Sequence, residues 1–391
     1  MRMVCHNNFV RISITYWVSH PLFVLVINKY IEGEILNKIL FAASTLEHIQ
    51  NFHMPYLDEL NQKRYEVHIL ADKQKDMENI YKSISCNWQK KMMSFSNIRE
   101  IFRIKKILCE EKYKKIIVHT TLAAFCVRMA AKMLKEKPEI IYMCHGYLFT
   151  DTFNFKNKFL LFCEKIVASV TDKLIVMNET DLKIANKHNL GKEIFFTNGV
   201  GIDVEKFNFS NNEKQKKEYR DEYGFNKEDI IFLNVAEFSK RKNQKELIVA
   251  FKKLNDSNIK LVLAGKGREF EKCKKLSQKL GLEKNIFFMG HIKDVKKLYI
   301  ASDYYISASK SEGMPMSVLE AASIGLPLLL SNKKGHKDII KSVRGLIYND
   351  KKDLTRKIND IIIYQREKND MKQYDILNIK EKIIDIYSKN F

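Results

Sequence analysis

Short apolar runs separated by longer amphipathic segments recur along the chain from about residue 38. Runs such as Lys115–His119 and Glu139–Cys144 have the length and composition of buried strands, and the segments between them are long enough for helices. Strands that alternate with helices predict a parallel, doubly wound α/β sheet. The pattern predicts strands at 38–43, 65–70, 115–119, 139–144 and 173–177, a loop at 44–53, and helices at 54–62, up to 134 and at 157–170.

A second series of the same kind follows a change in composition. Residues 199–207 contain glycine and residues 211–217 are charged and polar, which indicates a domain boundary. The later strands are predicted at 230–235, 259–264, 286–289, 304–307, 327–330 and 345–348, with a last helix at 378–389. Two doubly wound domains are therefore expected, and ligands of such sheets bind beyond the carboxyl ends of the strands.

The first 33 residues do not fit this alternation. Residues 12–27 are apolar, but His20-Pro21 interrupts them and the run is short for a membrane span. Basic residues precede the run, yet no clear small-residue cleavage site follows it. Residues 1–33 are therefore either an extra anchor or sequence outside the functional protein, and we favour the second interpretation.

Composition supports a globular protein of two domains. The 391 residues include 45% hydrophobic ones and only five prolines. The seven cysteines are scattered singly without Cys-x-x-Cys spacing, which argues against a disulfide framework and favours a reducing, cytoplasmic compartment.

The net charge of +21 has several possible origins. Nucleic-acid binding and attraction to an anionic membrane would each explain it, as would a bias towards lysine spread over surface helices. The basic residues are dispersed and no nucleic-acid fingerprint accompanies them. We interpret the charge as partly compositional, with a secondary contribution from membrane proximity and no role in nucleic-acid binding.

Two glutamates near the C-terminus stand eight positions apart, in the segment 311–320. Pro315 suits a first helical turn and Ser311 can cap it, which places Glu320 roughly two turns into a helix. The helix N-terminus between Glu312 and Glu320 offers free N–H groups and a positive dipole end to an anion. Acceptors on both sides of an anion site would suit a nucleotide sugar, although such a glutamate pair also occurs by chance on solvated helices.

This segment and the following Gly-Leu-Pro at 325–327 resemble the donor-site motif of the retaining glycosyltransferases of family 4, which have the GT-B fold. The resemblance runs from about Asn37 to the C-terminus. It implies two Rossmann-like domains facing across a cleft: residues 34–200 on the acceptor side, residues 201–374 binding the nucleotide sugar, and a helix at 375–391 returning to the first domain. Glu312 would position the donor sugar, Glu320 would bind the ribose, and Gly313, Met314 and Pro315 would line the donor site.

Residues 236–244, directly after a predicted strand, resemble the family's donor-phosphate loop, in which Lys242 matches the phosphate-binding lysine. A fixed cation there would stabilise the charge that gathers on a departing nucleoside diphosphate. Glu237 stands where many relatives carry arginine, and Arg241 could supply the second cation. A solvated basic run is the alternative interpretation.

Other turns give weaker indications. By the same resemblance, Gly267 would line the donor side, while His291 and Ile292 would contact the nucleobase through their backbone. Plain strand-ending turns explain these residues about as well.

In the first domain, His145 begins a His-Gly turn whose histidine would face the transferred sugar, and His119 is a weaker candidate for lining the cleft. The loop at 44–53 resembles one that receives the acceptor, with His48, Asn51 and His53 able to bond a sugar hydroxyl. Satisfied histidines at strand ends and local helix capping are the alternatives. No Asp-x-Asp or His-x-x-x-His stands where a metal would be held, so no metal and no cofactor are expected.

The resemblance implies a retaining, metal-independent glycosyltransferase of the capsular or extracellular polysaccharide group. Its donor would be a nucleoside-diphosphate sugar, most readily a UDP-sugar, and its acceptor a lipid-linked glycan at the inner face of the membrane. Residues 90–106 and 155–165 mix basic and aromatic residues, which suits peripheral membrane contact. A core helix with a basic outer face explains residues 155–165 about equally well. Two alternatives stay open: a sugar-nucleotide epimerase of the same fold, which would need no acceptor, and a basic nucleic-acid-binding protein.

Overall fold

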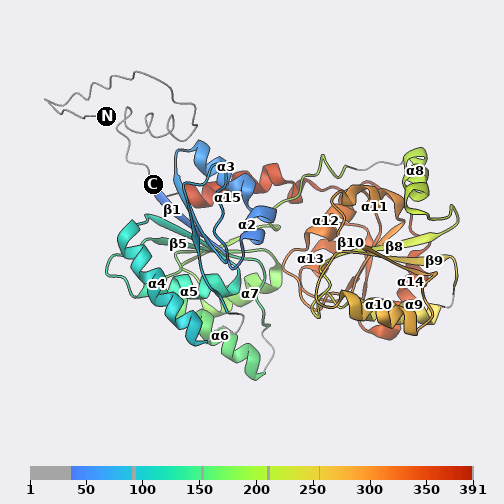
Figure 1. Ribbon diagram of the computed structural model, residues 1–391, viewed down its shortest axis with the longest axis horizontal. Helices are drawn as coiled ribbons and strands as arrows, with labels where there is room; N and C mark the ends of the chain where they lie inside the picture. The colour runs from blue at the N-terminus through green and yellow to red at the C-terminus, as the bar shows by residue number, and fades with distance from the viewer. Residues whose placement is uncertain (1–36, 90–93, 151–153, 209–211, 255, 390–391) are drawn as a thin grey trace, which may run out of the picture. The chain divides into compact units, whose positions relative to one another are not determined.

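The computed structural model describes residues 37–89, 94–150, 154–208, 212–254 and 256–389 (Figure 1). The extension predicted at 1–33 and residues 90–93, which begin the predicted basic and aromatic stretch at 90–106, lie outside these ranges. Among the helices within them, none combines the length and apolar character needed to cross a membrane.

The first sheet has seven parallel strands in the order β3-β2-β1-β4-β5-β6-β7 (Figure 1). Its central strands are almost entirely buried, as expected where helices cover both faces. The strands are β1 (Lys38–Ala42), β2 (Glu66–Ala71), β3 (Lys82–Ser85), β4 (Lys115–His119), β5 (Glu139–Cys144), β6 (Lys173–Val176) and β7 (Glu193–Phe196).

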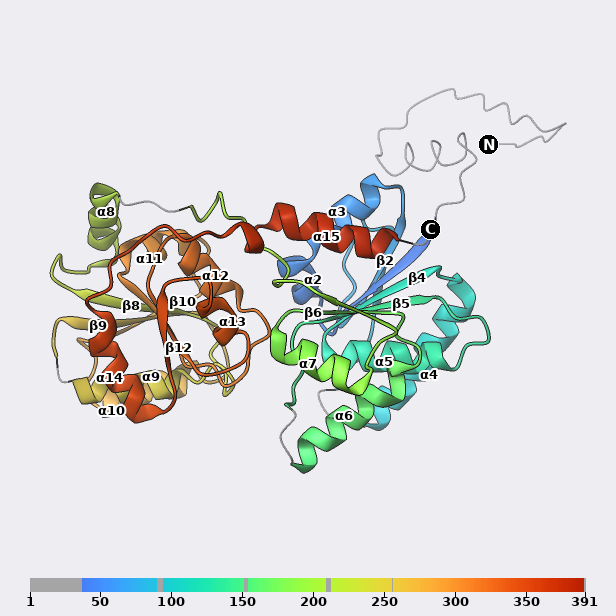
Figure 2. The same cartoon turned by 180° about the vertical axis from the view of Figure 1, so that it is seen from behind.

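Helices cover both faces of this sheet. One face packs against α2 (Leu46–Phe52), α3 (Met54–Gln62) and the last helix α15 (Ile376–Ser388). Figure 2 shows α3 and α15 side by side over the strands. The other face packs against α4 (Phe95–Glu111), α5 (Thr121–Lys132), α6 (Phe155–Ala168) and α7 (Glu179–His188).

The second sheet has six parallel strands in the order β10-β9-β8-β11-β12-β13. They are β8 (Ile230–Val235), β9 (Ile259–Ala264), β10 (Ile286–Gly290), β11 (Tyr304–Ser307), β12 (Leu328–Ser331) and β13 (Gly345–Tyr348). One apolar core joins this sheet to α11 (Val295–Ala301), α12 (Met316–Ser323) and α13 (His336–Ile340). The other joins it to α9 (Gln244–Leu254), α10 (Phe270–Lys279) and α14 (Lys351–Ile361).

The two doubly wound sheets confirm the predicted fold class, and most predicted strands lie within a residue or two of the observed ones. The predicted loop at 44–53 is wrong, because it contains helix α2. Thr45 caps that helix, since its Oγ1 accepts a hydrogen bond of 3.2 Å from the backbone N–H of His48. The edge strands β3 and β7 were not predicted, because their residues are exposed or half-buried and less uniformly apolar.

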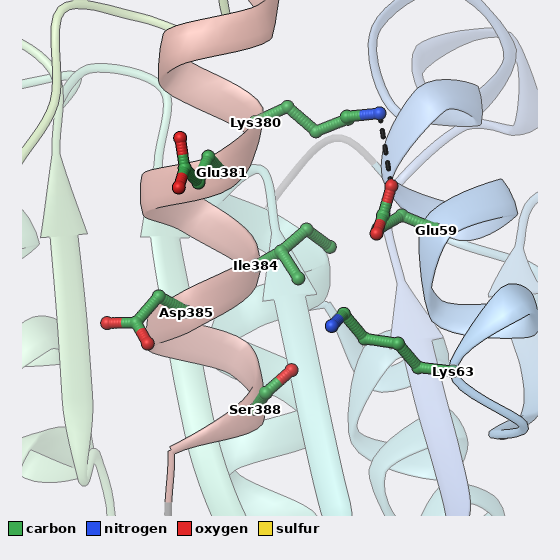
Figure 3. A pocket seen from close by; sticks show the side chains of 7 residues that line it. All are labelled: Glu59, Lys63, Lys380, Glu381, Ile384, Asp385 and Ser388. Atoms are coloured by element: carbon green, nitrogen blue, oxygen red, sulfur yellow. Dashed lines mark ion pairs between the residues drawn. The ribbon is translucent and has the colours of Figure 1, made fainter.

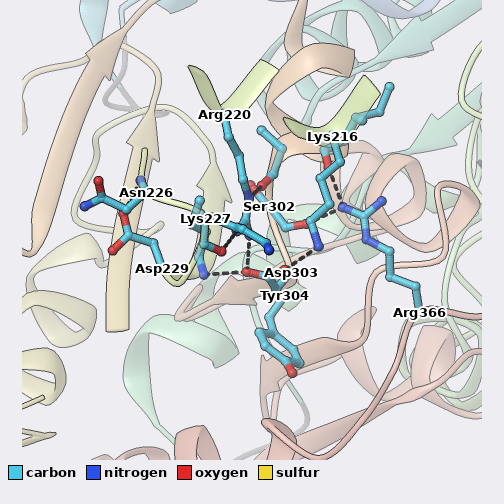
Figure 4. A network of polar contacts seen from close by, with 12 residues as sticks. Lys216, Arg220, Asn226, Lys227, Asp229, Ser302, Asp303, Tyr304 and Arg366 are labelled. Atoms are coloured by element: carbon cyan, nitrogen blue, oxygen red, sulfur yellow. Dashed lines mark hydrogen bonds and ion pairs between the residues drawn. The ribbon is translucent and has the colours of Figure 1, made fainter. Parts of the chain in front are cut away.

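The polar stretch predicted as a boundary at 211–217 enters a helix, α8 (Glu213–Tyr223), that belongs to the second sheet. Arg220 of α8 donates to Asp303 and to the carbonyl of Ala301, at 2.7 and 2.9 Å (Figure 4). Lys216 reaches the other oxygen of the same carboxylate at 2.7 Å. This network fixes α8 beside β11 and explains why so polar a segment folds as part of the domain. The boundaries at residues 200 and 374 stay predictions.

Buried lysines hold the last helix on the first sheet. Lys173 of β6 donates to the carbonyls of Ile386 and Lys389 near the end of α15, both at 3.0 Å. Lys115 of β4 reaches the carbonyl of Tyr387 at 2.5 Å. Glu139 forms ion pairs with both lysines, at 3.0 and 2.8 Å. The positive charges therefore cap the negative end of the α15 dipole.

Candidate donor and acceptor site

Helix α12 begins later than predicted. Its N-cap is Pro315, whose extended backbone and lack of a side-chain donor or acceptor leave the first turn without a side-chain cap. Ser311 therefore lies outside the helix and does not cap it, which corrects the prediction. Glu320 is the fifth helical residue, just over one turn in, instead of two. The uncapped N–H groups of the first turn remain available to an anion.

Glu312 is buried and holds both cations of the predicted phosphate loop. Its Oε1 lies 2.6 Å from Nζ of Lys242, and its Oε2 lies 2.8 Å from Nη1 of Arg241. Burial raises the pKa of Glu312, but the neighbouring Lys242 and Arg241 outweigh burial and bring the pKa down to about 2. The carboxylate is therefore ionised at neutral pH. One negative charge between two positive ones leaves a net charge of +1, which suits an additional anion.

The loop after β8 directs both cations to this point. Asn243 adopts a left-handed backbone conformation with φ of 59° immediately before α9, and its side chain donates to Glu246 at 2.9 Å. The carbonyl of Arg241 accepts a hydrogen bond of 2.8 Å from the N–H of Lys310, which ties the loop to the segment before Glu312. Glu237 is exposed and makes no ion pair within the described residues.

Glu320 is the second acid of the motif and has a different environment. Its Oε2 accepts a hydrogen bond of 2.8 Å from the hydroxyl of Tyr299 on α11. Burial raises the pKa of Glu320, while the hydrogen bond from Tyr299 acts in the opposite direction. Among the described residues, no cation forms an ion pair with it, so its free acceptor oxygen can receive a hydroxyl.

Close backbone packing at Gly313 joins this motif to the first sheet's strand ends. A Cβ added to Gly313 would lie 2.0 Å from the carbonyl oxygen of His145, so only glycine fits there. Gly146 has φ of 115°, and a Cβ there would lie 2.9 Å from Cα of Gly313. Gly335 closes the other side, because its added Cβ would lie 2.2 Å from the carbonyl oxygen of Gly313. His145 is thus adjacent in space to the donor motif.

The remaining predicted donor residues occupy the neighbouring strand ends. Gly267 has φ of 151°, and an added Cβ would lie 2.3 Å from the carbonyl oxygen of Phe238, so this glycine permits close packing of two loops. His291 is exposed and Ile292 half-buried beyond β10. Met314 is buried and lies against Gly199. These residues lie near the carboxyl ends of the strands, where ligands of such sheets bind. Their roles in donor binding stay predictions.

The predicted acceptor-side histidines converge with two strand-end histidines. The structure brings together His48 and His53 from the two ends of α2, His119 at the end of β4 and His145 after β5. One ligand atom from each lies within 4.8 Å of the others. Asn51 is exposed and takes no part in this group, which we call the four-histidine cluster.

These rings are uncharged at neutral pH. Burial lowers the pKa of His48 to about 4. Burial, reinforced by the neighbouring imidazoles, lowers the pKa values of His53, His119 and His145 well below the usual range. His53 and His119 are fully buried, so neither is a freely accessible partner for a large acceptor as the structure stands.

Several groups at the site had no signal in the sequence. Tyr299, which donates to Glu320, lies on α11, whose short sequence carries no recognisable motif. Lys334 is buried and donates to Asp181 Oδ1 at 2.7 Å and to the carbonyl of Tyr147 at 2.5 Å, which joins the segment before α13 to the first domain. His336 is buried near Glu312. Only their spatial neighbours, which are distant in the sequence, reveal them.

A cavity of about 400 Å³ lies elsewhere, between α3 and α15 (Figure 3). Charged groups from both helices line it, and Lys380 pairs with Glu59 at 3.1 Å. It contains none of the motif residues. The strand-end site is the better candidate for chemistry because the anion-binding groups converge there.

Comparisons with known proteins agree with this geometry. Residues 38–178 match the family model described as glycosyl transferase 4-like, and residues 215–376 match glycosyl transferases group 1. The chain is 29% identical to the putative glycosyltransferase EpsD of Bacillus subtilis over 309 residues, covering 78% of this chain and 81% of EpsD. It is 28% identical over 255 residues to the Escherichia coli UDP-Gal:alpha-D-GlcNAc-diphosphoundecaprenol alpha-1,3-galactosyltransferase, covering 63% of this chain and 65% of that protein.

Solved structures share the fold. Sucrose-phosphate synthase from Thermosynechococcus elongatus superposes with a TM-score of 0.72 at 15% identity, covering 90% of this chain and 98% of the other. HepE from Anabaena, solved in complex with UDP and glucose, gives a TM-score of 0.69 at 17% identity, covering 90% and 99%. Both likenesses concern the arrangement of two parallel sheets with their helices.

Proposed function

We infer that this chain, whose two halves match glycosyltransferase family models, is a glycosyltransferase with the GT-B fold that acts in bacterial polysaccharide biosynthesis. On that premise, we propose that it moves a sugar from a UDP-sugar to a lipid-linked glycan, with retention of the anomeric configuration. The main support for this proposal is the position of Glu312, which is buried between Lys242 and Arg241 and precedes the uncapped start of α12.

The charge of this group supports a diphosphate donor. Two cations and one carboxylate leave an excess positive charge next to free N–H groups at a helix start, and both features favour an anion. Glu320, just over one turn into α12, accepts a hydrogen bond from Tyr299, and in this proposal its other oxygen accepts hydrogen bonds from ribose hydroxyls. The name of the Escherichia coli relative specifies UDP-Gal, and HepE was solved with UDP, which favours uridine over other nucleotides.

The ionisation of Glu312 limits its role. With its pKa near 2, this carboxylate cannot donate a proton at neutral pH; it orients the two cations and can accept a hydrogen bond from the donor sugar. In the proposed step, the bond between the anomeric carbon and the diphosphate oxygen breaks while the acceptor oxygen bonds to the same face of that carbon. The acceptor proton passes to the leaving phosphate, whose developing charge Lys242 stabilises. Two side-chain cations and the helix start supply this stabilisation without a metal at the diphosphate.

An exposed apolar surface supports a membrane-bound acceptor. On α4, Phe95, Ile98 and Phe102 recur at helical spacing on one exposed side. On α6, Phe155, Phe159 and Phe162 do the same. The two helices flank α5 in the same layer (Figure 1). We call these six residues, five phenylalanines and Ile98, the aromatic surface.

The helices that carry the aromatic surface also carry basic residues. Both helices carry exposed basic side chains close to the aromatic residues: Arg99 and Lys106 on α4, and Lys156, Lys158 and Lys165 on α6. Exposed aromatic residues beside positive charges are typical of peripheral binding to anionic lipid headgroups. The excess of 68 lysines and arginines over 47 acidic residues acts in the same direction. We propose that this face contacts the inner leaflet, where a lipid-linked acceptor is presented.

The test uses purified full-length protein with a panel of UDP- and GDP-sugars, with and without a membrane extract containing lipid-linked glycans. We expect release of UDP from one sugar nucleotide only when the extract is present, with transfer of the sugar to the lipid fraction. Conversion of the sugar nucleotide to an epimer without an acceptor would instead establish the epimerase alternative. Release of nucleotide from none of the donors would contradict the proposal.

A further inference from the structure

The four-histidine cluster is arranged like a metal centre. Its members come from adjacent parts of one sheet: β1, β4 and β5 are neighbours, and the rings of His48, His53, His119 and His145 lie at or just beyond their carboxyl ends. His48 and His53 are close in the sequence, but His119 and His145 arrive through separate crossover connections. The fold therefore collects the four imidazoles from three chain segments at one point.

The spacing of the nitrogens fits a tetrahedral ion. Adjacent ligands of a Zn²⁺ ion with bonds of about 2.0–2.1 Å lie about 3.3 Å apart. Nε2 of His48 lies 3.3 Å from Nε2 of His53, and Nδ1 of His119 lies 3.1 Å from Nε2 of His145. The six ring-to-ring distances range from 4.0 Å, between His53 and His119, to 6.4 Å, between His48 and His119. One ligand atom from each ring lies within 4.8 Å of the others, so small movements of the rings would bring all four nitrogens to the spacing that a shared ion requires.

Hydrogen bonding leaves the cluster incomplete. Within the described part of the chain, the recorded hydrogen bonds of the four side chains run only between the rings themselves. Nδ1 of His53 and Nε2 of His119 are buried and have no hydrogen-bond partner. These two nitrogens are not the ones that face His48 and His145, so an ion shared by the four rings would not supply their partner. Such an ion would instead replace the two contacts between neutral rings, and neutral imidazole nitrogens are suited to bind it.

The surroundings hold the rings in position. Phe41 of β1 packs on the buried side, with its ring centroid 5.3 Å from that of His53 and 4.3 Å from that of His119. Thr120, next to His119, has φ of 60°, which is strained for a β-branched residue. Its Oγ1 accepts a 2.9 Å hydrogen bond from the N–H of Ser44. The end of β1 and the end of β4 are thereby fixed to each other.

We propose that the four-histidine cluster binds one divalent transition-metal ion, with Zn²⁺ as the physiological choice. Four imidazole nitrogens with no carboxylate among them suit Zn²⁺, Ni²⁺ and Co²⁺ and do not suit Mg²⁺ or Ca²⁺. The ion ties α2, which lies over the predicted acceptor side, to the strand end that carries His145 and packs against Gly313. It is separate from the diphosphate site, where Lys242 and Arg241 supply the positive charge.

The experiment measures metal binding directly and needs neither donor nor acceptor. The full-length protein is purified without a histidine tag, stripped with a chelator, dialysed and titrated with Co²⁺, whose visible absorption is intense only in tetrahedral sites. We expect saturation at one Co²⁺ per chain, displacement of Co²⁺ by Zn²⁺, and one Zn²⁺ per chain by elemental analysis. A folded wild-type protein that gives no tetrahedral Co²⁺ spectrum would overturn the proposal.

A matched pair of variants assigns the site. His48→Gln removes a half-buried ligand, and His188→Gln changes a half-buried histidine on α7 outside the cluster. We expect His48→Gln to lower the affinity for Zn²⁺ by at least about 10-fold, and His188→Gln to leave it unchanged. Equal affinity in His48→Gln and the wild type would overturn the assignment. If His48→Gln does not fold, the wild-type Co²⁺ titration still decides the matter, and because it does not depend on sugar transfer, its failure is distinct from failure of the proposed activity.

Discussion

At the scale of single residues, Lys242 has the most specific role. Its ammonium group is only half-buried and lies 2.6 Å from Glu312, so it is fixed in direction yet accessible to a phosphate. We expect Lys242→Ala to lower kcat by about 10²–10³-fold, as losing one preorganised electrostatic stabiliser does. Initial rates of UDP release with acceptor present measure this. Lys240→Ala, which removes an exposed lysine from the same loop, is the control and should keep the wild-type rate; full activity in Lys242→Ala would remove Lys242 from the mechanism.

Glu312 should also make the stability of the protein depend on pH. Its pKa is about 2 in the folded protein, below the ordinary value of 4.5, so its ionised form stabilises the fold. This contribution is complete above pH 4.5 and is lost as the pH falls through the window from about 4.5 towards 2. We expect urea unfolding to show Glu312→Gln less stable than the wild type at pH 7, with a difference that shrinks below pH 4.5. A difference that stays constant down to pH 3 would contradict this role.

At the scale of elements, the sequence predicts what depends on local pattern and misses what depends on partners. Strands such as β4, β5, β8 and β9 are mostly apolar, because both faces are covered, and their limits were predicted to the residue. Helix α8 has no comparable apolar pattern. Ion pairs of Arg220 and Lys216 with Asp303 hold it in place. Those contacts join positions far apart in the sequence, so a polar stretch was predicted as a boundary.

The last helix provides a test at this scale. Lys173 donates to two carbonyls of α15 and pairs with Glu139, while it is itself almost fully buried. We expect Lys173→Met to lower the free energy of unfolding by about 1–3 kcal/mol, because buried acceptors then lose their donor. Urea unfolding measures this, with Lys382→Met on the exposed side of α15 as the control. Equal stability of Lys173→Met and the control would show that α15 is held by apolar packing alone.

At the scale of the whole molecule, the site is assembled from motifs that were predicted separately. Glu312, Lys242 and Arg241 were identified from two motifs, and the structure places their charged atoms in contact. The meeting of His48 and His53 with His119 and His145 was not foreseen, because it depends on the order of β1, β4 and β5 in the sheet. Each residue was a candidate alone, but a metal centre needs the distances between them, and the sequence spacing across the intervening strands and helices does not fix those distances.

Binding to a membrane is the property of the whole molecule that the aromatic surface predicts. Phe155 and Phe162 are 88% and 60% exposed on α6, so changing both to serine removes apolar contact area without opening a cavity. We expect Phe155→Ser/Phe162→Ser to reduce cosedimentation with vesicles of anionic lipid several-fold, while UDP release with a water-soluble acceptor analogue is kept. Ile363 is similarly exposed but lies beyond α14, so Ile363→Ser is the control.

The attraction to the membrane combines apolar contact with charge. High salt should therefore weaken vesicle binding by the wild type and leave a residual apolar binding that the double variant lacks. Equal pelleting of wild type and double variant would place the acceptor-presenting membrane on another face.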